Sequence, residues 1–140
     1  MRISDFTMEK LLLRSGVVTA EQLATLKEEG VSSRRPLQEI ALENEVIDDK
    51  ALAQAFSAYA QIPYVEVNPN DITSDVLNKI PEHIARQYNA ILFKVDGNGI
   101  SHLAMDDPDD VQAINFIEKE IGPNTKIYVA PHDNIIAALE

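Results

Sequence analysis

LLRSGVVTAEQL (residues 12–23) and ALENEVIDDKAL (residues 41–52) carry the same order of signals, with Leu12 matching Ala41 and Leu23 matching Leu52. Each begins on an apolar residue of a helical stripe, continues with a pair of aliphatic residues, and ends on a leucine. Thr19-Ala-Glu-Gln22 has the spacing of a capping box, and Asp48 is the matching cap in the second copy. Because a short internal period of this kind marks a duplicated supersecondary unit, the sequence predicts two helix-turn-helix units within residues 1–62.

Residues around the two copies supply the remaining helix boundaries. Ser4 is suited to cap the first helix, and Gly16 to end it, because glycine accepts the left-handed conformation found at helix ends. The second helix is expected to stop near Gly30. Pro36 suits the first turn of the third helix, where no backbone N–H is needed. Glu45 occupies the position that matches Gly16, so the repeat is imperfect there.

From Gln61 onward the pattern becomes mixed. The turn Asp96-Gly-Asn-Gly99 joins two alternating apolar runs and predicts a hairpin with a type I′ or similar turn. Taken together, the sequence predicts an α+β fold, in which a helical repeat subdomain (residues 1–62) packs on a small α/β sandwich with a short mixed sheet (residues 63–140). The expected strands are 64–67, 90–95, 100–105 and 126–130, and the expected helices are one through Val76, Leu77 and Ile80, interrupted by Pro81, then 82–88, 111–121 and 133–139.

The composition of the chain disfavours some classes of function and excludes others. The formal net charge is −11 and the chain has no cysteine, which disfavours binding to a nucleic acid polymer and excludes thiol chemistry. The sequence has no basic-then-apolar leader and no apolar run long enough to cross a bilayer, so the protein is expected to be soluble and cytoplasmic, without membrane insertion.

Four carboxylates, Asp106, Asp107, Asp109 and Asp110, form the densest acidic cluster. Such oxygens can hold Ca²⁺ or Mg²⁺, but the spacing lacks the glycine and distal glutamate of an EF-hand loop. The favoured interpretation is that they cap a helix beginning at Val111. In a second interpretation, Asp107 contacts a ligand at the junction of the two subdomains.

No other cluster supports catalysis. A phosphate-binding loop needs a Gly-Lys dipeptide, which the sequence lacks. His83, His102 and His132 have no spaced second ligand for zinc, and His102 is expected to point outward from its strand. An enzyme would need an acid-base pair or a metal site that these residues do not supply, so we expect neither an active site nor a cofactor.

The basic segment Ser32-Ser-Arg-Arg35 is the one concentrated basic spot on an acidic chain. Arg34 and Arg35 could contact a phosphate or an acidic partner. They could equally belong to a solvated linker between the helical units. Because the segment lies between the two repeats, it is our first choice for a ligand contact.

Several passages in order carry a resemblance to a known family. They are the repeated helical unit, Ala60-Gln-Ile-Pro-Tyr-Val-Glu-Val67, Ile80-Pro-Glu-His-Ile-Ala-Arg-Gln-Tyr88, the hairpin, and Leu103-Ala-Met-Asp-Asp-Pro-Asp109. This order resembles the N-terminal domain of type II secretion and type IV pilus assembly ATPases, that is, of general secretory pathway protein E, which is related to the MshE-type N-terminal domain.

The resemblance implies a non-catalytic docking module. In that family the domain precedes an ATPase motor and docks the hexamer to an inner-membrane platform or assembly protein. For this chain it implies a motor domain in the same or an adjacent chain, and a cytoplasmic location, peripheral to the inner membrane through partners.

One branch of the family binds cyclic di-GMP through an Arg-Leu-Gly opening in each helical unit. Here the openings are Thr7-Met-Glu9 and Pro36-Leu-Gln38, with Arg35 one residue early. A missing arginine fork and added carboxylates disfavour a dianion, so cyclic di-GMP binding is the alternative hypothesis. The residues that this resemblance, the basic segment and the acidic cluster select as ligand contacts are Arg34, Arg35, Leu37, Leu12, Gly16 and Asp107.

Overall fold

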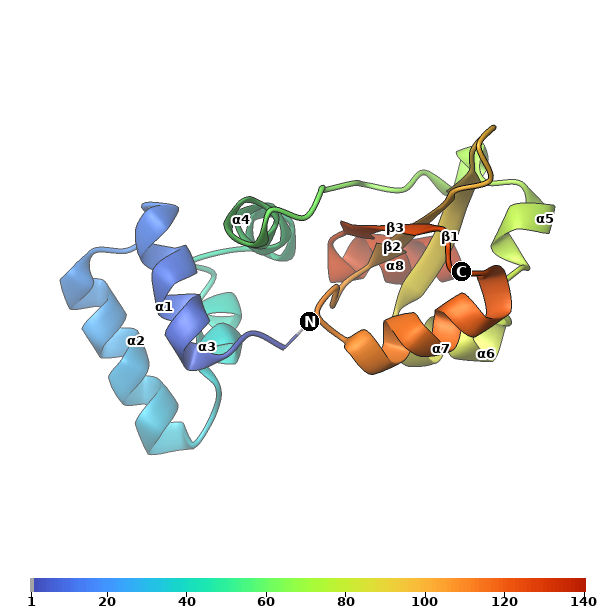
Figure 1. Cartoon of the computed structure of the whole chain (residues 1–140). Coiled ribbons are helices and arrows are strands. Elements are labelled where there is room, and N and C mark those ends of the chain that lie inside the picture. The colour runs from blue at the N-terminus through green and yellow to red at the C-terminus, as the bar shows by residue number, and fades with distance from the viewer. Residues whose placement is uncertain (1) are drawn as a thin grey trace.

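The computed structural model describes residues 2–140. Four helices come first and form what we call the helical lobe. A three-stranded sheet and its helices form the α/β lobe beside it (Figure 1). The helical lobe consists of α1 (Asp5–Arg14), α2 (Ala20–Ser33), α3 (Leu37–Glu43) and α4 (Asp49–Ala60).

The predicted duplication is confirmed by the backbone of both units. Gly16 and Glu45, at matching positions of the two units, both follow the end of a helix in the left-handed conformation, with φ of 72° and 58°. Thr19 and Asp48 also match, and both are N-caps that accept a hydrogen bond from the N–H three positions ahead. The Thr19 N–H also donates to the Gln22 side-chain oxygen at 2.9 Å, which completes the predicted capping box. Matching helix ends therefore set the same turn twice.

The left-handed turn yields a prediction that tests the repeat. A side chain with a Cβ is strained at positive φ, whereas glycine is not. We expect Glu45→Gly to raise the free energy of unfolding by about 0.5–1 kcal/mol, and Gly16→Ala to lower it by about 1 kcal/mol. Urea denaturation followed by circular dichroism measures both changes. If both substitutions changed the free energy of unfolding in the same direction, the result would contradict a turn shared by the two units.

The core of the helical lobe is built from equivalent positions of the two units. The apolar side chains that the repeat places in phase are buried in both copies, and they pack in one cluster. These pairs are Met8 with Leu37, Leu11 with Ile40, Leu12 with Ala41, Val18 with Ile47, and Leu23 with Leu52. Each unit thus buries its apolar stripe against the other, as predicted.

The sheet of the α/β lobe has the order β1-β2-β3, with β1 (Ala90–Val95), β2 (Ser101–Met105) and β3 (Thr125–Val129). β1 and β2 are antiparallel and β2 and β3 are parallel, so the predicted mixed sheet is confirmed. The other elements are η1 (Pro69–Asp71), α5 (Ser74–Leu77), α6 (Glu82–Tyr88), α7 (Val111–Ile121) and α8 (His132–Leu139). Leu103 packs in the cluster that includes α6 and α7, and Ala104 in the cluster of α8, so helices cover both faces.

The hairpin turn is not of type I′. Only Gly99 (φ 77°) has a positive φ in this turn, which the structure describes in full. The Gly99 N–H donates to the Asp96 carbonyl, and the Asp96 carboxylate accepts from Asn98 and Ile100 N–H groups. The aspartate side chain stabilises a type I turn with glycine at its end, an arrangement that the same residue types allow.

The prediction of a strand over residues 64–67 is wrong, because only Tyr64 pairs with the sheet. Tyr64 forms a single parallel bridge with Val129. Further along, the Val67 N–H and C=O bond to the side-chain amide of Asn134 in α8, at 2.8 Å and 2.9 Å. Because that amide takes both backbone groups, no ladder continues past the bridge.

The predicted helix through Ile80 is also shorter than expected. α5 ends at Leu77, and Asn78 is its C-cap. Ile80 is buried but lies outside any helix, directly before Pro81. A residue before proline avoids the helical conformation, which explains the early end.

The two lobes pack on each other, as predicted. Val129 of β3 joins the apolar cluster of the helical lobe. The Asp133 N–H at the start of α8 donates to the Asp49 carboxylate of α4 at 3.0 Å. The division of the chain into subdomains at residues 62 and 63 stays a prediction.

Candidate functional site

The basic segment forms the connection between α2 and α3. Arg34 takes the left-handed conformation (φ 56°), and its N–H donates to the Val31 carbonyl. The Arg35 N–H donates to the Gly30 carbonyl at 3.0 Å. A Cβ on Gly30 would lie 3.1 Å from the Arg35 carbonyl oxygen, a tight contact, so this close return of the chain favours glycine.

A groove of about 450 Å³ lies over this connection. We call it the connector groove. Its walls come from the start of α1, the second half of α2 and the start of α3. Its lining residues are Asp5, Lys27, Gly30, Val31, Arg34, Arg35, Pro36 and Leu37.

The three basic residues of the groove differ in their partners. Lys27 pairs with Glu9 at 3.0 Å. Arg35 pairs with Glu43 and, at 3.7 Å, with Glu39, so acidic side chains largely neutralise it. Arg34 is exposed and, among residues 2–140, forms no ion pair. Arg34 is therefore the cation that an incoming anionic group can bind without displacing an internal partner.

The groove also has an apolar element. Its apolar residue is Val31, which is 81% exposed near the end of α2. It lines a second, more open hollow of about 450 Å³ together with Ala24, Lys27, Glu28 and Ser32. The two hollows share Lys27 and Val31, so they form one continuous surface along α2. An apolar side chain beside an available cation suits a partner that has both an apolar and an acidic side chain.

The structure brings together half of the predicted ligand residues. Arg34, Arg35 and Leu37 line the connector groove, although Leu37 is itself buried. Leu12 is fully buried in the helical core. Gly16 lies past the opposite end of α1, and its position has open space around it. The ligand roles of these residues stay predictions.

Sequence reasoning missed Asp5, Lys27, Gly30 and Val31. A signal for part of this set existed, because Lys27 and Val31 are four residues apart, which is the spacing of one helix face. Asp5 could not be found in this way. Its carboxylate reaches the groove by accepting the Leu37 N–H at 3.0 Å, a contact between residues 32 positions apart.

The acidic cluster belongs to the α/β lobe, and its residues do not line the connector groove. Asp110 is the N-cap of α7 and accepts the Ala113 N–H, so the capping interpretation is confirmed for Asp110. Asp106 is buried and bonds to the His132 ring at 2.7 Å. Burial raises the pKa of Asp107, the hydrogen bond from the Asp109 N–H opposes that rise, and the neighbouring carboxylates of Asp106 and Asp110 add to it. Residues 2–140 contain no group of three side chains suited to hold a metal ion.

The prediction that His102 points outward is wrong. Its ring lies between the Asp96 carboxylate, at 2.9 Å, and the Tyr128 hydroxyl, at 2.7 Å. The ring of Phe93 packs nearby. The hydrogen bond from His102 lowers the pKa of Asp96, with help from the Ile100 N–H. This cluster ties the hairpin to β3, which is a structural role.

Within residues 2–140, no helix has the length and apolarity needed to cross a bilayer.

Comparisons with solved structures identify the fold. A structure of MshE with cdg superposes with a TM-score of 0.73 at 19% identity, covering 93% of this chain and 94% of the other. The N-terminal domain of XpsE in one crystal form gives a TM-score of 0.68 at 16% identity, over 99% and 96% of the two chains. A second crystal form of XpsE gives 0.56 at 14% identity, over the same shares. No curated protein matches the sequence.

The comparison with family models agrees with these structures. The model of the MshEN domain matches residues 60–140, which is more than half of the chain. The α+β architecture and the family predicted from the sequence are thereby confirmed. The chain belongs to the MshEN domain family.

Proposed function

We propose that this chain is the N-terminal docking and regulatory module of a secretion or type IV pilus assembly ATPase, and that its connector groove binds an inner-membrane platform protein. Membership of the MshEN family and the shared fold with the N-terminal domain of XpsE support the parent class. The observation that carries the docking role is Arg34, a cation with no ion-pair partner in the described chain, next to the exposed Val31. The module works in the cytoplasm, and its motor lies in the same or an adjacent chain.

The chemistry of the groove indicates what the partner offers. On a chain with a net charge of −11, an acidic partner is repelled at long range and must be held by a local basic contact. Arg34 supplies that contact, and its planar guanidinium can form two parallel hydrogen bonds with one carboxylate. Val31 supplies apolar area beside it. The partner segment therefore carries an acidic residue next to an apolar one.

Calorimetry with the cytoplasmic portion of a platform protein tests the docking role. We expect Arg34→Ala to weaken binding about tenfold, because it removes a charge-assisted hydrogen bond without leaving a buried group unpaired. Lys79→Ala, at an exposed lysine outside the groove, is the matched control and should bind as the wild type does. Binding that is absent from the wild type, or unchanged by Arg34→Ala, would contradict the proposal.

Binding of cyclic di-GMP is the second candidate. The fold shared with MshE, whose structure contains cdg, favours it, as does the meeting of Arg34, Arg35 and Leu37 in one groove. Two features oppose cyclic di-GMP binding. Glu39 and Glu43 form ion pairs with Arg35, and Glu45 lies at the position where the first unit has glycine.

Titration of the chain with cyclic di-GMP separates the two candidates. A sensor would release heat at ligand concentrations of tens of micromolar or below, and Arg34→Ala would reduce that heat. The docking role predicts no heat with cyclic di-GMP and binding to the platform protein alone. Circular dichroism must first show that the protein is folded, so that an absence of heat can be interpreted.

A further inference from the structure

Two helices, one in each lobe, keep large apolar side chains in solvent. Phe6 on α1 is 67% exposed, and Phe116 on α7 is 43% exposed. Leu13 and Val17 are exposed at the end of α1 and just after it, as is Val111 on α7. Phe6 and Leu13 are seven positions apart and lie on one face of α1, and an exposed apolar face of this kind is a candidate interaction surface. None of these residues lines the connector groove, so the proposed docking role does not account for them.

α1 presents an apolar and basic stripe. Phe6, Lys10 and Leu13 follow i, i+4, i+7 spacing and lie on one side of the helix. The Lys10 ammonium is 4.2 Å from the centre of the Phe6 ring. Glu9, the acidic residue beside this stripe, pairs with Lys27 of α2 and is thereby neutralised. The α1 stripe (Phe6, Lys10, Leu13) therefore offers an aromatic ring with a positive charge on an acidic protein.

α7 presents the opposite combination. Phe116 and Glu120 are four residues apart, the same spacing as the aromatic and basic pair of α1. The Phe116 ring packs on Tyr88 of α6 with centroids 5.9 Å apart, which fixes its position. Glu118 adds a second negative charge, and Lys119 offsets one of the two. The α7 stripe (Phe116, Glu120) therefore offers a fixed ring with a negative charge.

We propose that the α1 stripe of one copy of this chain packs on the α7 stripe of a second copy. The ring of Phe6 meets the ring of Phe116, and Lys10 lies beside Glu120. Aromatic pairs and opposite charges on a shared spacing contribute both affinity and register. Copies with a net charge of −11 repel one another, so a self-contact must use a locally basic surface, which α1 supplies.

The contact joins two different surfaces and is therefore heterologous. After two copies pair, the first copy keeps a free α7 stripe and the second keeps a free α1 stripe, so the contact repeats and either closes into a ring or extends. The area involved is small, which places the association in the weak class. We expect half-association on the order of 100 μM, weaker at high salt because exposed charges are screened.

Sedimentation velocity of the 140-residue chain over micromolar to millimolar concentrations tests this contact. The expected result is an average mass that rises with concentration and falls with added salt. Lys10→Glu and Glu120→Lys should each weaken association about tenfold, because each places like charges opposite one another. Phe6→Ser gives an independent test that does not depend on charge. A wild-type chain that stays monomeric throughout would overturn the proposal.

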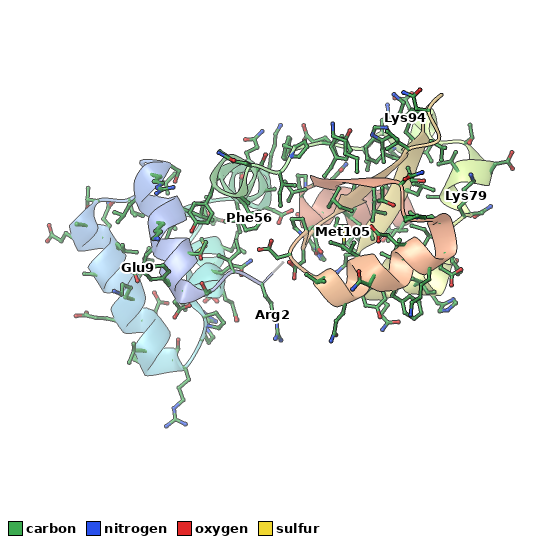
Figure 2. The ribbon with its side chains drawn as sticks, viewed as in Figure 1. Arg2, Glu9, Phe56, Lys79, Lys94 and Met105 are labelled. Atoms are coloured by element: carbon green, nitrogen blue, oxygen red, sulfur yellow. The ribbon has the colours of Figure 1, made fainter. Side chains whose placement is uncertain are left out.

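A mixture of the two charge-reversed variants makes the test specific. In an equimolar mixture, each variant's altered stripe meets a complementary stripe on the other variant, so association should return. Lys94→Glu is the control reversal, since the exposed Lys94 of β1 lies apart from both α1 and α7 (Figure 2). Neither Lys10 nor Glu120 belongs to the apolar core, and thermal melts verify that the variants fold. Association that survives Glu120→Lys, or a mixture that stays monomeric, would show that these two stripes do not meet.

Discussion

Replacing Leu12 by alanine is expected to lower the free energy of unfolding by about 3 kcal/mol. Leu12 is 0% exposed and packs in the cluster that joins all four helices of the helical lobe. The substitution removes buried apolar area and leaves a cavity that the surrounding helices fill only in part. Urea denaturation followed by circular dichroism measures the loss.

The neighbouring residue provides the control. Leu13 follows in the sequence with the same side chain, yet it is 46% exposed. We expect Leu13→Ala to change stability by less than about 0.5 kcal/mol. The pair also decides the role of Leu12, which resemblance to the cyclic di-GMP-binding branch selected as a ligand contact. A Leu12→Ala protein of normal stability that loses only ligand binding would contradict the structural role.

The helical repeat could be predicted because its signals are local. Helix caps at Ser4, Thr19 and Asp48 need only the residues three positions ahead. The apolar stripes follow directly from the helical period. Glu45 shows how strongly the surroundings fix the turn, since the chain takes the left-handed conformation there without glycine. An imperfect repeat therefore still specifies two equivalent turns.

Elements that depend on distant partners could not be predicted as well. The apolar alternation of residues 64–67 indicated a strand, but the structure gives one bridge because α8 supplies the other hydrogen bonds. In the same way, Tyr128 encloses His102 from 26 positions away. Periodicity describes which side of an element is apolar, and it does not tell which polar side chain lies against that element in the folded chain.

The candidate site was predictable only in its charges. Arg34 and Arg35 stood out as a basic pair between the repeats, and the structure places both in one groove. That Arg35 is neutralised while Arg34 stays available depends on where Glu39 and Glu43 fall on α3. Asp107, selected as a ligand contact at the junction, lies in the loop that leads into α7, and its ligand role stays a prediction.

Asn134→Ala is expected to lower the free energy of unfolding by about 2–4 kcal/mol. The Asn134 side chain accepts the Val67 N–H at 2.8 Å and donates to the Val67 carbonyl at 2.9 Å. Val67 is buried, so alanine leaves a backbone donor and a backbone acceptor without partners and away from water. Each such group costs about 1–3 kcal/mol. Urea denaturation measures the total, and hydrogen exchange of the Val67 amide reports the loss locally.

Two further variants separate this effect from a general weakening of a helix. Asn115→Ala changes an exposed asparagine on α7 and should leave stability within about 0.5 kcal/mol of the wild type. Asn134→Asp keeps an acceptor for the Val67 N–H but faces the Val67 carbonyl with a carboxylate, so exchange at this amide should stay slow while stability still falls. If Asn134→Ala left the Val67 amide fully protected, another group would have to hold the segment. The hydrogen bonds between Val67 and Asn134 of α8 would then not explain why residues 64–67 form no strand.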